Sequence, residues 1–411
     1  MTMSRAEQLP GRPAAKLVIA LVVDTIHPYS TGGREIRYHE YARRLPEAAE
    51  LHVFTMRWWD GASVRVDGAV TFHGICPLLP VCRGGRRSIA QAIIFAIACV
   101  RLLTFRFDVL EADHMPYLQL PVLRAIASLK RKRLVVTWHE VWGPSYWREY
   151  LGRLGALSWL VEWLAMHLPD HIIAASTQTE ERLKRFLGPE AAVTTAPNGI
   201  DLEAISATEP DTDGRDIIVV GRLMTHKRVD MVLDAVALLH AQGLRTRCCI
   251  VGDGPQRRAL DDQARALGIF DLVEFRHDVR EQKDVYALLK SAKVFVSASE
   301  REGFGIAVLE AVACGVPVIT TSAPDNVAQY LVTRSRRGVI CDPSAVALAA
   351  AIGELVLALA SSRVGPHAVE PWLGDYSWES MTATVFAALA PGRSSPSEPG
   401  DARLGAVSQP T

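Results

Sequence analysis

Residues 302–310 read Glu-Gly-Phe-Gly-Ile-Ala-Val-Leu-Glu, and they follow the apolar stretch KVFVSAS at residues 293–299. The apolar stretch predicts a buried strand, and the run from Gly305 predicts a helix that begins just beyond the end of that strand. Gly303 and Gly305 let the backbone approach a ligand closely, and the free amides at a helix N-terminus favour an anion such as a diphosphate. This stretch therefore predicts a parallel α/β domain with a phosphate-binding edge.

Two carboxylates frame this run. Glu302 is expected in the loop and Glu310 more than one turn inside the helix, which separates them by roughly 8–10 Å. That separation is too long for two acids that share a proton, but it suits two acceptors that bind hydroxyl groups at two parts of one extended ligand. The alternative interpretation of Glu310 is an ordinary acid near a helix N-terminus, where negative charge is favoured in any case.

Outward from this stretch, short apolar runs alternate with longer helical stretches along the chain. The alternation begins with LVIALVV at residues 17–23 and restarts after about residue 214, with DIIVVGR at residues 216–222. This order predicts an α/β fold of two doubly wound, mostly parallel domains. Open parallel sheets bind ligands at the carboxyl ends of their strands, so two such domains that face each other would form a deep cleft.

The composition limits the partners. The chain has 411 residues, with 45 Lys plus Arg and 45 Asp plus Glu, so no overall charge draws it onto nucleic acid. Seven cysteines without C-x-x-C spacing indicate reduced thiols and a cytoplasmic protein, with no zinc site. Any anion site must therefore be built locally.

The sequence permits two environments for residues 88–105. The apolar stretch IAQAIIFAIACV lies at residues 89–100 and follows Arg83, Arg86 and Arg87. The first interpretation is a helix in the core, and the second is a helix in the membrane interface whose arginines contact anionic lipid. The stretch is a poor candidate for a transmembrane span. Peripheral contact with an anionic membrane, at the inner face of the plasma membrane, stays an open hypothesis.

Two cations follow the strand expected at residues 216–220. Arg222 and Lys227 are five residues apart and precede a helix, so they can present a planar guanidinium and a point charge to one polyanion. Taken alone, both would be ordinary solvated side chains. Gly252 lies in a tight turn after the next strand, and we expect it to line the cleft.

The first half of the chain offers two further candidates. Gly33 belongs to the loop TGGRE at residues 31–35, which lacks the full G-x-G-x-x-G fingerprint and so does not support a dinucleotide oxidoreductase. His139 follows the apolar stretch at residues 133–138, and on the residues alone a satisfied structural histidine is the more common interpretation.

The run at residues 302–319, E-G-F-G-x-x-x-L-E-A-x-A-C-G-x-P-V-I, resembles the E-x7-E motif of retaining GT-B glycosyltransferases of family four, the glycosyl transferases group 1 type. G-R-L-x-x-x-K at residues 221–227 and P-N-G-I-D at residues 197–201 resemble further segments of that family. The resemblance implies two Rossmann-like domains that face each other across a cleft. It also implies transfer of a sugar from a nucleotide diphosphate-sugar to a hydroxyl acceptor, in glycan, glycolipid or polysaccharide biosynthesis.

The resemblance also implies roles for the charged candidates. Glu302 would contact the donor sugar and Glu310 the ribose hydroxyls. Arg222 and Lys227 would bind the diphosphate and stabilise the leaving group, and His139 would lie beside the donor sugar. No metal and no cofactor are expected, since these cations and the helix N-terminus would stabilise the leaving group.

The remaining implied features concern donor binding and domain organisation. The donor-binding glycines and their neighbour are Gly33, Gly252, Gly303, Phe304 and Gly305. The expected segments are a flexible N-terminus at 1–15, a first domain on the acceptor side at 16–200, a second domain on the donor side at 201–370, a helix that crosses back to the first domain at 371–390, and a disordered tail at 391–411.

Several alternatives stay open. A non-catalytic binding or assembly subunit of the same fold is one, and a GT-B sugar-nucleotide epimerase is another. The family often has a glycine where this chain has Arg276, His277 and Asp278, so the identity of the nucleotide base is open. The donor sugar and the acceptor are open as well, and lipid-linked hydroxyls are among the candidate acceptors. Trp159 and Trp163 share one helix face, a spacing more typical of core than of a sugar platform.

Overall fold

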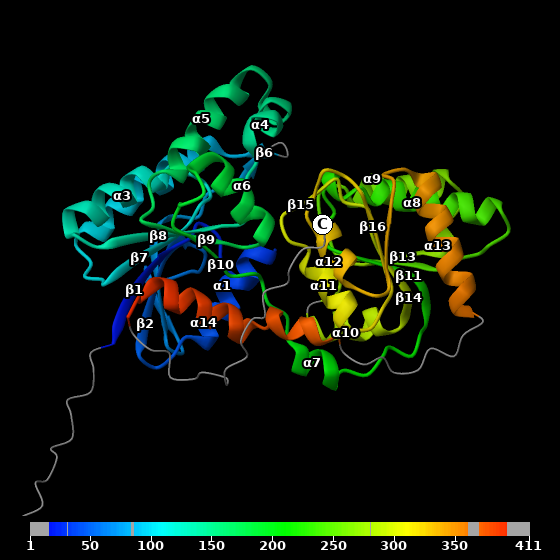
Figure 1. The fold of residues 1–411 in the computed structure, drawn as a ribbon. Helices are drawn as coiled ribbons and strands as arrows, with labels where there is room; N and C mark the ends of the chain where they lie inside the picture. The colour runs from blue at the N-terminus through cyan, green and yellow to red at the C-terminus, as the bar shows by residue number, and fades with distance from the viewer. Residues whose placement is uncertain (1–15, 31, 84–85, 280, 361–369, 393–411) are drawn as a thin grey trace, which may run out of the picture.

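The computed structural model describes residues 16–30, 32–83, 86–279, 281–360 and 370–392. It contains two large sheets side by side, each covered by helices on both faces (Figure 1). The expectation for residues 1–15 and nearly all of that for residues 391–411 lie outside the described residues. The predicted α/β class, with two Rossmann-like sheets, is confirmed.

The first sheet has eight strands in the order β10-β9-β8-β7-β1-β2-β4-β3, and every neighbouring pair is parallel except β3 and β4. The continuous apolar sequence of β1 is buried on both sides, as a central parallel strand requires. The strands are β1 (Leu17–Val22), β2 (Ala49–Arg57), β3 (Val64–Asp67), β4 (Val70–Pro77), β7 (Val109–Asp113), β8 (Arg133–Trp138), β9 (His171–Ala174) and β10 (Val193–Thr195).

The second sheet has six parallel strands in the order β13-β12-β11-β14-β16-β18. They are β11 (Arg215–Val220), β12 (Cys248–Val251), β13 (Val273–Arg276), β14 (Ala292–Ser297), β16 (Val318–Thr321) and β18 (Gly338–Cys341). Two further sheets have two strands of two residues each, and they pair β15 (Arg301–Glu302) with β17 (Asp325–Asn326) and β5 (Cys82–Arg83) with β6 (Arg86–Arg87).

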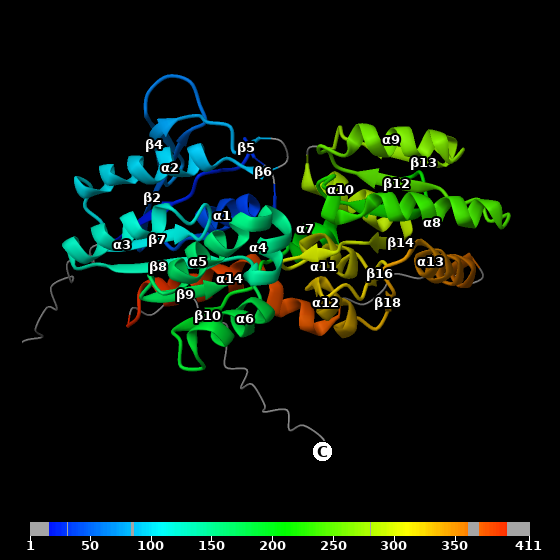
Figure 2. The same cartoon turned by 90° about the horizontal axis from the view of Figure 1, so that it is seen from above.

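Helices cover the two faces of the first sheet unequally. One face carries α1 (Gly33–Arg44) together with α14 (Trp378–Leu389), from the far end of the chain. The other face carries the remaining helices of this half, which share one core (Figure 2). They are α2 (Ile89–Ala98), η1 (Cys99–Leu103), α3 (Gln119–Lys130), α4 (Gly143–Leu151), η2 (Gly152–Leu154), α5 (Gly155–Met166) and α6 (Thr177–Leu187).

The second sheet is also enclosed from both sides. On one face pack α8 (Val229–Ala241), α9 (Arg257–Ala266) and α13 (Ala345–Ala360). On the other pack α7 (Leu202–Ala207), α10 (Gln282–Lys290), α11 (Ile306–Ala313) and α12 (Ala328–Arg334). Short 3-10 turns complete this half at η3 (Thr225–Lys227), η4 (Phe270–Leu272) and η5 (Pro371–Tyr376).

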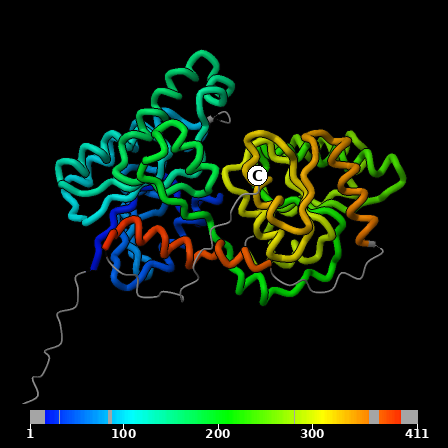
Figure 3. Tube along the Cα trace, viewed as in Figure 1, coloured from blue at the N-terminus to red at the C-terminus, as the bar shows by residue number. Residues whose placement is uncertain are grey.

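The chain crosses between the two halves twice, near Ile200 and near Ser377, and the two crossing segments lie side by side. Ile200 forms a bridge with Ser377, and its amide donates to the Tyr376 carbonyl at 2.8 Å. A Cβ on Gly199 would lie 2.4 Å from the Trp378 nitrogen, so only glycine permits this approach. The last described helix then runs back beneath the first half (Figure 3). We propose residues 16–200 and 201–370 as the two domains, with 371–390 as the returning segment.

Helix α2 is buried on one face only. Gln91, Ala92, Phe95 and Ala96 are buried, whereas Ile89 and other large apolar residues are exposed. The core interpretation of residues 88–105 therefore holds for one side of the helix. Within the described parts of the chain, no helix combines the length and the apolar character that a membrane crossing requires.

The tryptophan pair of α5 also divides between core and surface. Trp159 packs on the first core, and its ring lies 4.7 Å from the ring of Phe186. Trp163, in contrast, is 38% exposed. Arg87, one of the arginines that the membrane-interface interpretation would place at anionic lipid, forms an ion pair with the buried Asp24 at 2.6 Å.

Candidate active site

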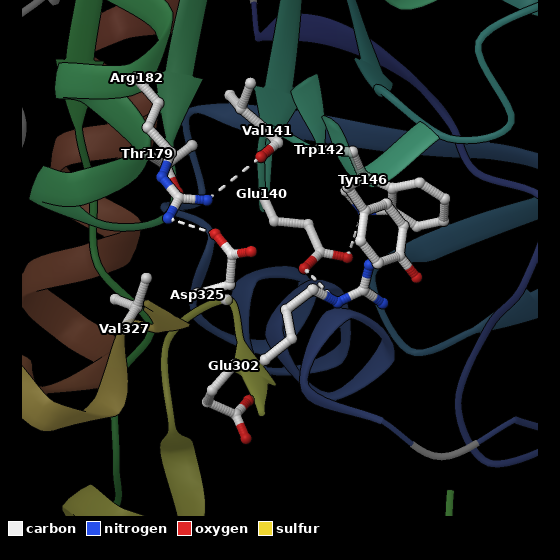
Figure 4. Close-up of a pocket in the computed structure, with 11 residues that line it drawn as sticks. Glu140, Val141, Trp142, Tyr146, Thr179, Arg182, Glu302, Asp325 and Val327 are labelled. Carbon is white, nitrogen blue, oxygen red and sulfur yellow. Dashed lines mark hydrogen bonds and ion pairs between the residues drawn. The ribbon is translucent and has the colours of Figure 1, made fainter. Parts of the chain in front are cut away.

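Residues from both sheets meet at a pocket between the two domains. The first domain contributes Glu140 and the start of α4, and the second contributes Glu302 and Gly303 (Figure 4). Both contributions follow the carboxyl ends of parallel strands, β8 and β14, because that is where an open α/β sheet presents its loops. The cleft expected from the sequence is therefore lined as that rule predicts.

Two of the predicted glycines, Gly303 and Gly33, lie where the two domains approach each other, and Gly305 packs within the second domain. Gly305 is the N-cap of α11 with φ of 96°, and a Cβ there would lie 2.7 Å from the Cβ of Ala328. A Cβ on Gly303 would lie 3.3 Å from the His139 carbonyl, and one on Gly33 would lie 3.0 Å from the Ile306 side chain. The first amides of a helix have no partner within it, so those of α11 are the donors that an anion would meet here.

The charged candidates of the second domain gather beside this helix start. The Lys227 ammonium forms an ion pair with Glu302, and Arg222 is exposed. Glu302 itself lies in the short strand β15, where we had expected a loop. Burial and then the positive charges of Arg301, Lys227 and Arg222 lower the pKa of His226 to about 3. Three positive charges therefore act on the His226 ring, and Glu302 pairs with one of them, that of Lys227.

Glu310 lies deeper, inside α11. Its side chain is buried, and it accepts a hydrogen bond from the Gln282 amide at 2.7 Å. Burial raises the pKa of Glu310 to about 8, although its hydrogen bonds with Tyr286 and Gln282 favour the ionised form. The acid can therefore change its protonation near neutral pH when a ligand binds.

The turns after β11 and β12 pack directly on each other. Gly252 has φ of 136°, and a Cβ there would lie 2.1 Å from the Gly221 carbonyl oxygen. The Leu223 amide donates to the Asp253 carbonyl at 2.9 Å, which fixes the two turns together. This packing places Gly252 beside the turn that carries Arg222. Phe304, the remaining donor-binding candidate, is buried in the core beneath α11.

The first domain contributes a buried network that the sequence analysis did not identify. The carboxylate of Asp113, at the end of β7, bonds to His139 Nε2 at 3.0 Å and to Arg34 Nη1 at 3.3 Å. Burial alone would raise the pKa of Asp113, but Arg34 and the His139 bond lower it well below its ordinary value. Because a carboxylate only accepts, His139 carries its proton on Nε2, so the neutral ring has Nδ1 as its acceptor.

Arg34 is the centre of this network. It follows Gly33 at the start of α1, and its guanidinium also lies 3.2 Å from Asp24 and 3.0 Å from Glu35. All three residues lie at strand ends: Asp24 follows β1, Asp113 is the last residue of β7, and His139 follows β8. The strand-end rule that singled out His139 therefore applies equally to both aspartates, and it could have found them.

Among the described residues, no three His, Cys, Asp or Glu side chains converge as the ligands of a metal ion would. The D-x-D sequence at residues 211–213 lies away from the cleft, and Asp211 pairs with Arg215 at 3.0 Å.

Two family models match consecutive parts of the chain. Glycosyltransferase Family 4 matches residues 31–204, and Glycosyl transferases group 1 matches residues 202–360. A glycogen synthase of Mycobacterium tuberculosis is 31% identical over 247 residues, 58% of this chain and 58% of the relative. The GDP-mannose-dependent alpha-(1-6)-phosphatidylinositol monomannoside mannosyltransferase of Mycolicibacterium smegmatis is 29% identical over 249 residues, 54% of this chain and 62% of the relative. These alignments thus span less than two thirds of either relative.

Solved structures match over nearly the whole chain. A sucrose-phosphate synthase from Thermosynechococcus elongatus aligns with a TM-score of 0.67 and 19% identity, covering 91% of this chain and 95% of that one. WaaG, a glycosyltransferase involved in lipopolysaccharide biosynthesis, aligns with a TM-score of 0.66 and 18% identity, covering 91% and 100%. These likenesses concern the fold. They show the GT-B fold, and the matches of both halves to family models show that the chain belongs to the glycosyl transferases group 1 family.

Proposed function

We propose that this chain is a retaining, metal-independent glycosyltransferase that moves a sugar from a nucleotide diphosphate-sugar to a hydroxyl acceptor. The observation that carries the proposal is the ion pair between Lys227 and Glu302 near the start of helix α11, because Glu302 also lines a pocket between the two domains. It joins a cation suited to a phosphate and an acceptor suited to sugar hydroxyls at one place.

Donor binding would exchange the partners of this ion pair. The diphosphate takes the Lys227 ammonium, with Arg222 and the α11 amides as further donors. The freed Glu302 carboxylate then accepts hydrogen bonds from hydroxyls of the donor sugar, and Glu310 accepts those of the ribose. Fixed positive charge at the departing diphosphate is the expected main source of rate acceleration.

The transfer step would break the bond between the anomeric carbon and the diphosphate oxygen. The acceptor oxygen bonds to the same carbon on the same face, and its proton passes to the departing phosphate. His139, which Asp113 holds with its proton on Nε2, accepts a hydrogen bond from a hydroxyl of the donor sugar. The close approach of Gly303 and Gly33 to the opposite domain would limit the access of water to the reacting carbon.

The test is a screen of nucleotide sugars with simple sugar, polysaccharide and glycolipid acceptors, with release of nucleoside diphosphate as the signal. The proposal expects acceptor-dependent release with retention of the anomeric configuration. Formation of an epimer without any acceptor would instead support the epimerase. Calorimetric binding of a nucleotide sugar without turnover over the whole panel would support a non-catalytic subunit. The names of the relatives place glucans and glycolipids first among the acceptors to try.

We also propose peripheral contact with the cytoplasmic face of an anionic membrane. Helices α2 and α5 pack on the same core and cover the same face of the first sheet (Figure 2). Apart from the buried Glu162, neither helix contains a charged residue. The large apolar side chains exposed on α2, η1, η2 and α5 are Ile89, Ile93, Ile94, Ile97, Val100, Leu103, Leu154, Leu157, Leu160, Trp163 and Leu164.

Basic side chains border this apolar surface. Arg101 and Arg106 are exposed next to η1, and Arg153 is exposed beside the start of α5. Apolar side chains that enter the interface and arginines that meet lipid phosphates are the two components of peripheral binding. A lipid-linked acceptor would then be met at the surface where it resides.

Co-flotation with vesicles tests this second proposal. Wild-type protein should float with vesicles that contain anionic lipid, and the double variant Ile89→Ser, Ile97→Ser should stay at the bottom. Val346→Ser is the matched control, because Val346 is 70% exposed on α13 in the other domain. Absence of flotation at low salt, or flotation of the double variant equal to wild type, would remove the proposal.

A further inference from the structure

The strand that carries Glu302 belongs to a very small sheet. Strand β15 pairs with β17 in a register that places Arg301 beside Asp325 and Glu302 beside Asn326. The Asn326 amide donates to the Thr320 hydroxyl and to the carbonyl of the next residue, both at 2.9 Å, which ties this ribbon to the end of β16. Contacts that restrain Arg301 and Asp325 therefore also restrain Glu302, which lies in the same ribbon.

Arg301 reaches across the cleft into the first domain. Its guanidinium lies 4.1 Å from the ring centre of Tyr146 and 4.7 Å from that of Trp142, both presented by the start of α4 (Figure 4). The Glu140 carboxylate lies 3.7 Å away. The Arg301 side chain is only 17% exposed, so these contacts are largely shielded from solvent.

A second contact crosses the cleft from the neighbouring strand. Arg182 on α6 donates to the Asp325 carboxylate at 2.8 Å and to the Val141 carbonyl at 3.3 Å (Figure 4). Arg301 and Asp325, one residue from each strand of the ribbon, therefore both contact the other domain. We call Arg301, Asp325 and their partners Tyr146, Trp142 and Arg182 the clasp.

The first-domain side of the clasp is rigid. The buried Glu162 accepts hydrogen bonds from the amides of Trp142 and Gly143 at 2.9 and 3.1 Å, and from the Trp147 indole at 2.7 Å. These bonds satisfy the free amides at the start of α4 and fix this helix to α5. Arg301 thus inserts into a pre-formed aromatic site.

We propose that Arg301 is a positioning residue that fixes Glu302 against the donor sugar by anchoring the β15·β17 ribbon to α4. The proposal rests on the proposed function only in that Glu302 contacts the donor. Loss of the Arg301 contact loosens the ribbon and lets the cleft open on this side. The affinity for the donor then falls, and hydrolysis of the donor increases relative to transfer to the acceptor.

The first experiment needs no donor. Hydrogen exchange of peptides that cover residues 143–151 and 301–306 is compared between wild type and Arg301→Met. Arg334→Met is the matched control, because Arg334 stacks at 4.6 Å on Trp372, a residue of the returning segment that packs against the core of the second domain. We expect about tenfold faster exchange of both peptides in Arg301→Met, equivalent to ~1.4 kcal/mol, and no change there in the control. Unchanged exchange in Arg301→Met would overturn the proposal.

The second experiment uses the nucleotide sugar that the screen identifies. Arg301→Met should raise the ratio of donor hydrolysis to transfer by about fivefold or more, with KM for the donor rising more than kcat falls, and Arg301→Lys should recover part of the loss. Arg301→Met combined with Tyr146→Leu should be no worse than either change alone. Additive losses, or an unchanged ratio, would refute the positioning role. If no nucleotide sugar reacts, the proposed function fails while the exchange result still decides the clasp.

Discussion

Replacing Lys227 by alanine removes the cation that pairs with Glu302 in the free protein. The Lys227 side chain is 24% exposed and that of Glu302 is 19% exposed, so the pair is partly shielded from solvent. An ion pair of this kind contributes about 1 kcal/mol or less to folding, so the variant should fold normally. The cost should appear in catalysis instead.

The expected catalytic loss is at least about 100-fold in kcat/KM, which corresponds to ~2.7 kcal/mol of lost transition-state stabilisation. Fixed charges at a leaving group act most strongly when that group departs, so kcat should fall at least as much as the donor KM rises. Lys293→Ala is the control, since Lys293 forms an ion pair with Asp216 at 2.8 Å away from the cleft.

The assay is release of nucleoside diphosphate under saturating acceptor, with circular dichroism to verify folding. Lys293→Ala should keep wild-type turnover. A folded Lys227→Ala protein that retains turnover within about threefold of wild type would refute the assignment of this cation to the leaving group.

Three further predictions concern Glu310, Asp113 and Gly305. Burial raises the pKa of Glu310 to about 8, so nucleotide-sugar affinity should increase as the pH rises through that value; an equal increase for Glu310→Gln in calorimetry between about pH 7 and 9 would contradict this. Asp113→Asn should lower kcat by about 10- to 100-fold because the proton position on His139 is no longer fixed, and additive losses on combination with His139→Gln would contradict the link. Gly305→Ala should lower the free energy of unfolding by at least about 2 kcal/mol in urea titrations, because its new Cβ would lie 2.7 Å from the Cβ of Ala328. Gly61→Ala is the control, and it should cost only about 1 kcal/mol because its Cβ would meet nothing within 4 Å. Equal effects of the two changes would argue against a close approach at Gly305.

The sequence predicted the two-sheet architecture because the alternation of short apolar runs with helical stretches is a local property. It also predicted that Lys227 and Glu302 follow strand ends, and in a parallel α/β sheet those ends lie at one edge. The catalytic and donor-binding roles of these residues stay predictions.

The missed residues depend on contacts that no local pattern encodes. Arg34 and Asp113 are 79 residues apart, and they meet only because β1 and β7 are neighbours in the sheet. Arg301 is unremarkable in its own strand, and its importance comes from Tyr146 in the other domain.

Helix α2 shows a different limit. Its sequence is apolar on all sides, so periodicity could not say which face is buried. The structure buries Phe95 and exposes Ile97, a distinction that depends on where the sheet lies. A sequence pattern can therefore indicate apolar surface without locating it.

The return of α14 to the first sheet has a consequence for synthesis of the chain. Trp378, Met381, Val385, Phe386 and Leu389 form part of the core that also contains β1 residues. While the ribosome is still translating the second half, one side of the first sheet lacks this helix and exposes its apolar side chains. The first half can therefore complete this core only after α14 has been synthesised and has left the ribosome, so this side of the sheet is a site where an emerging chain would aggregate or recruit a cover.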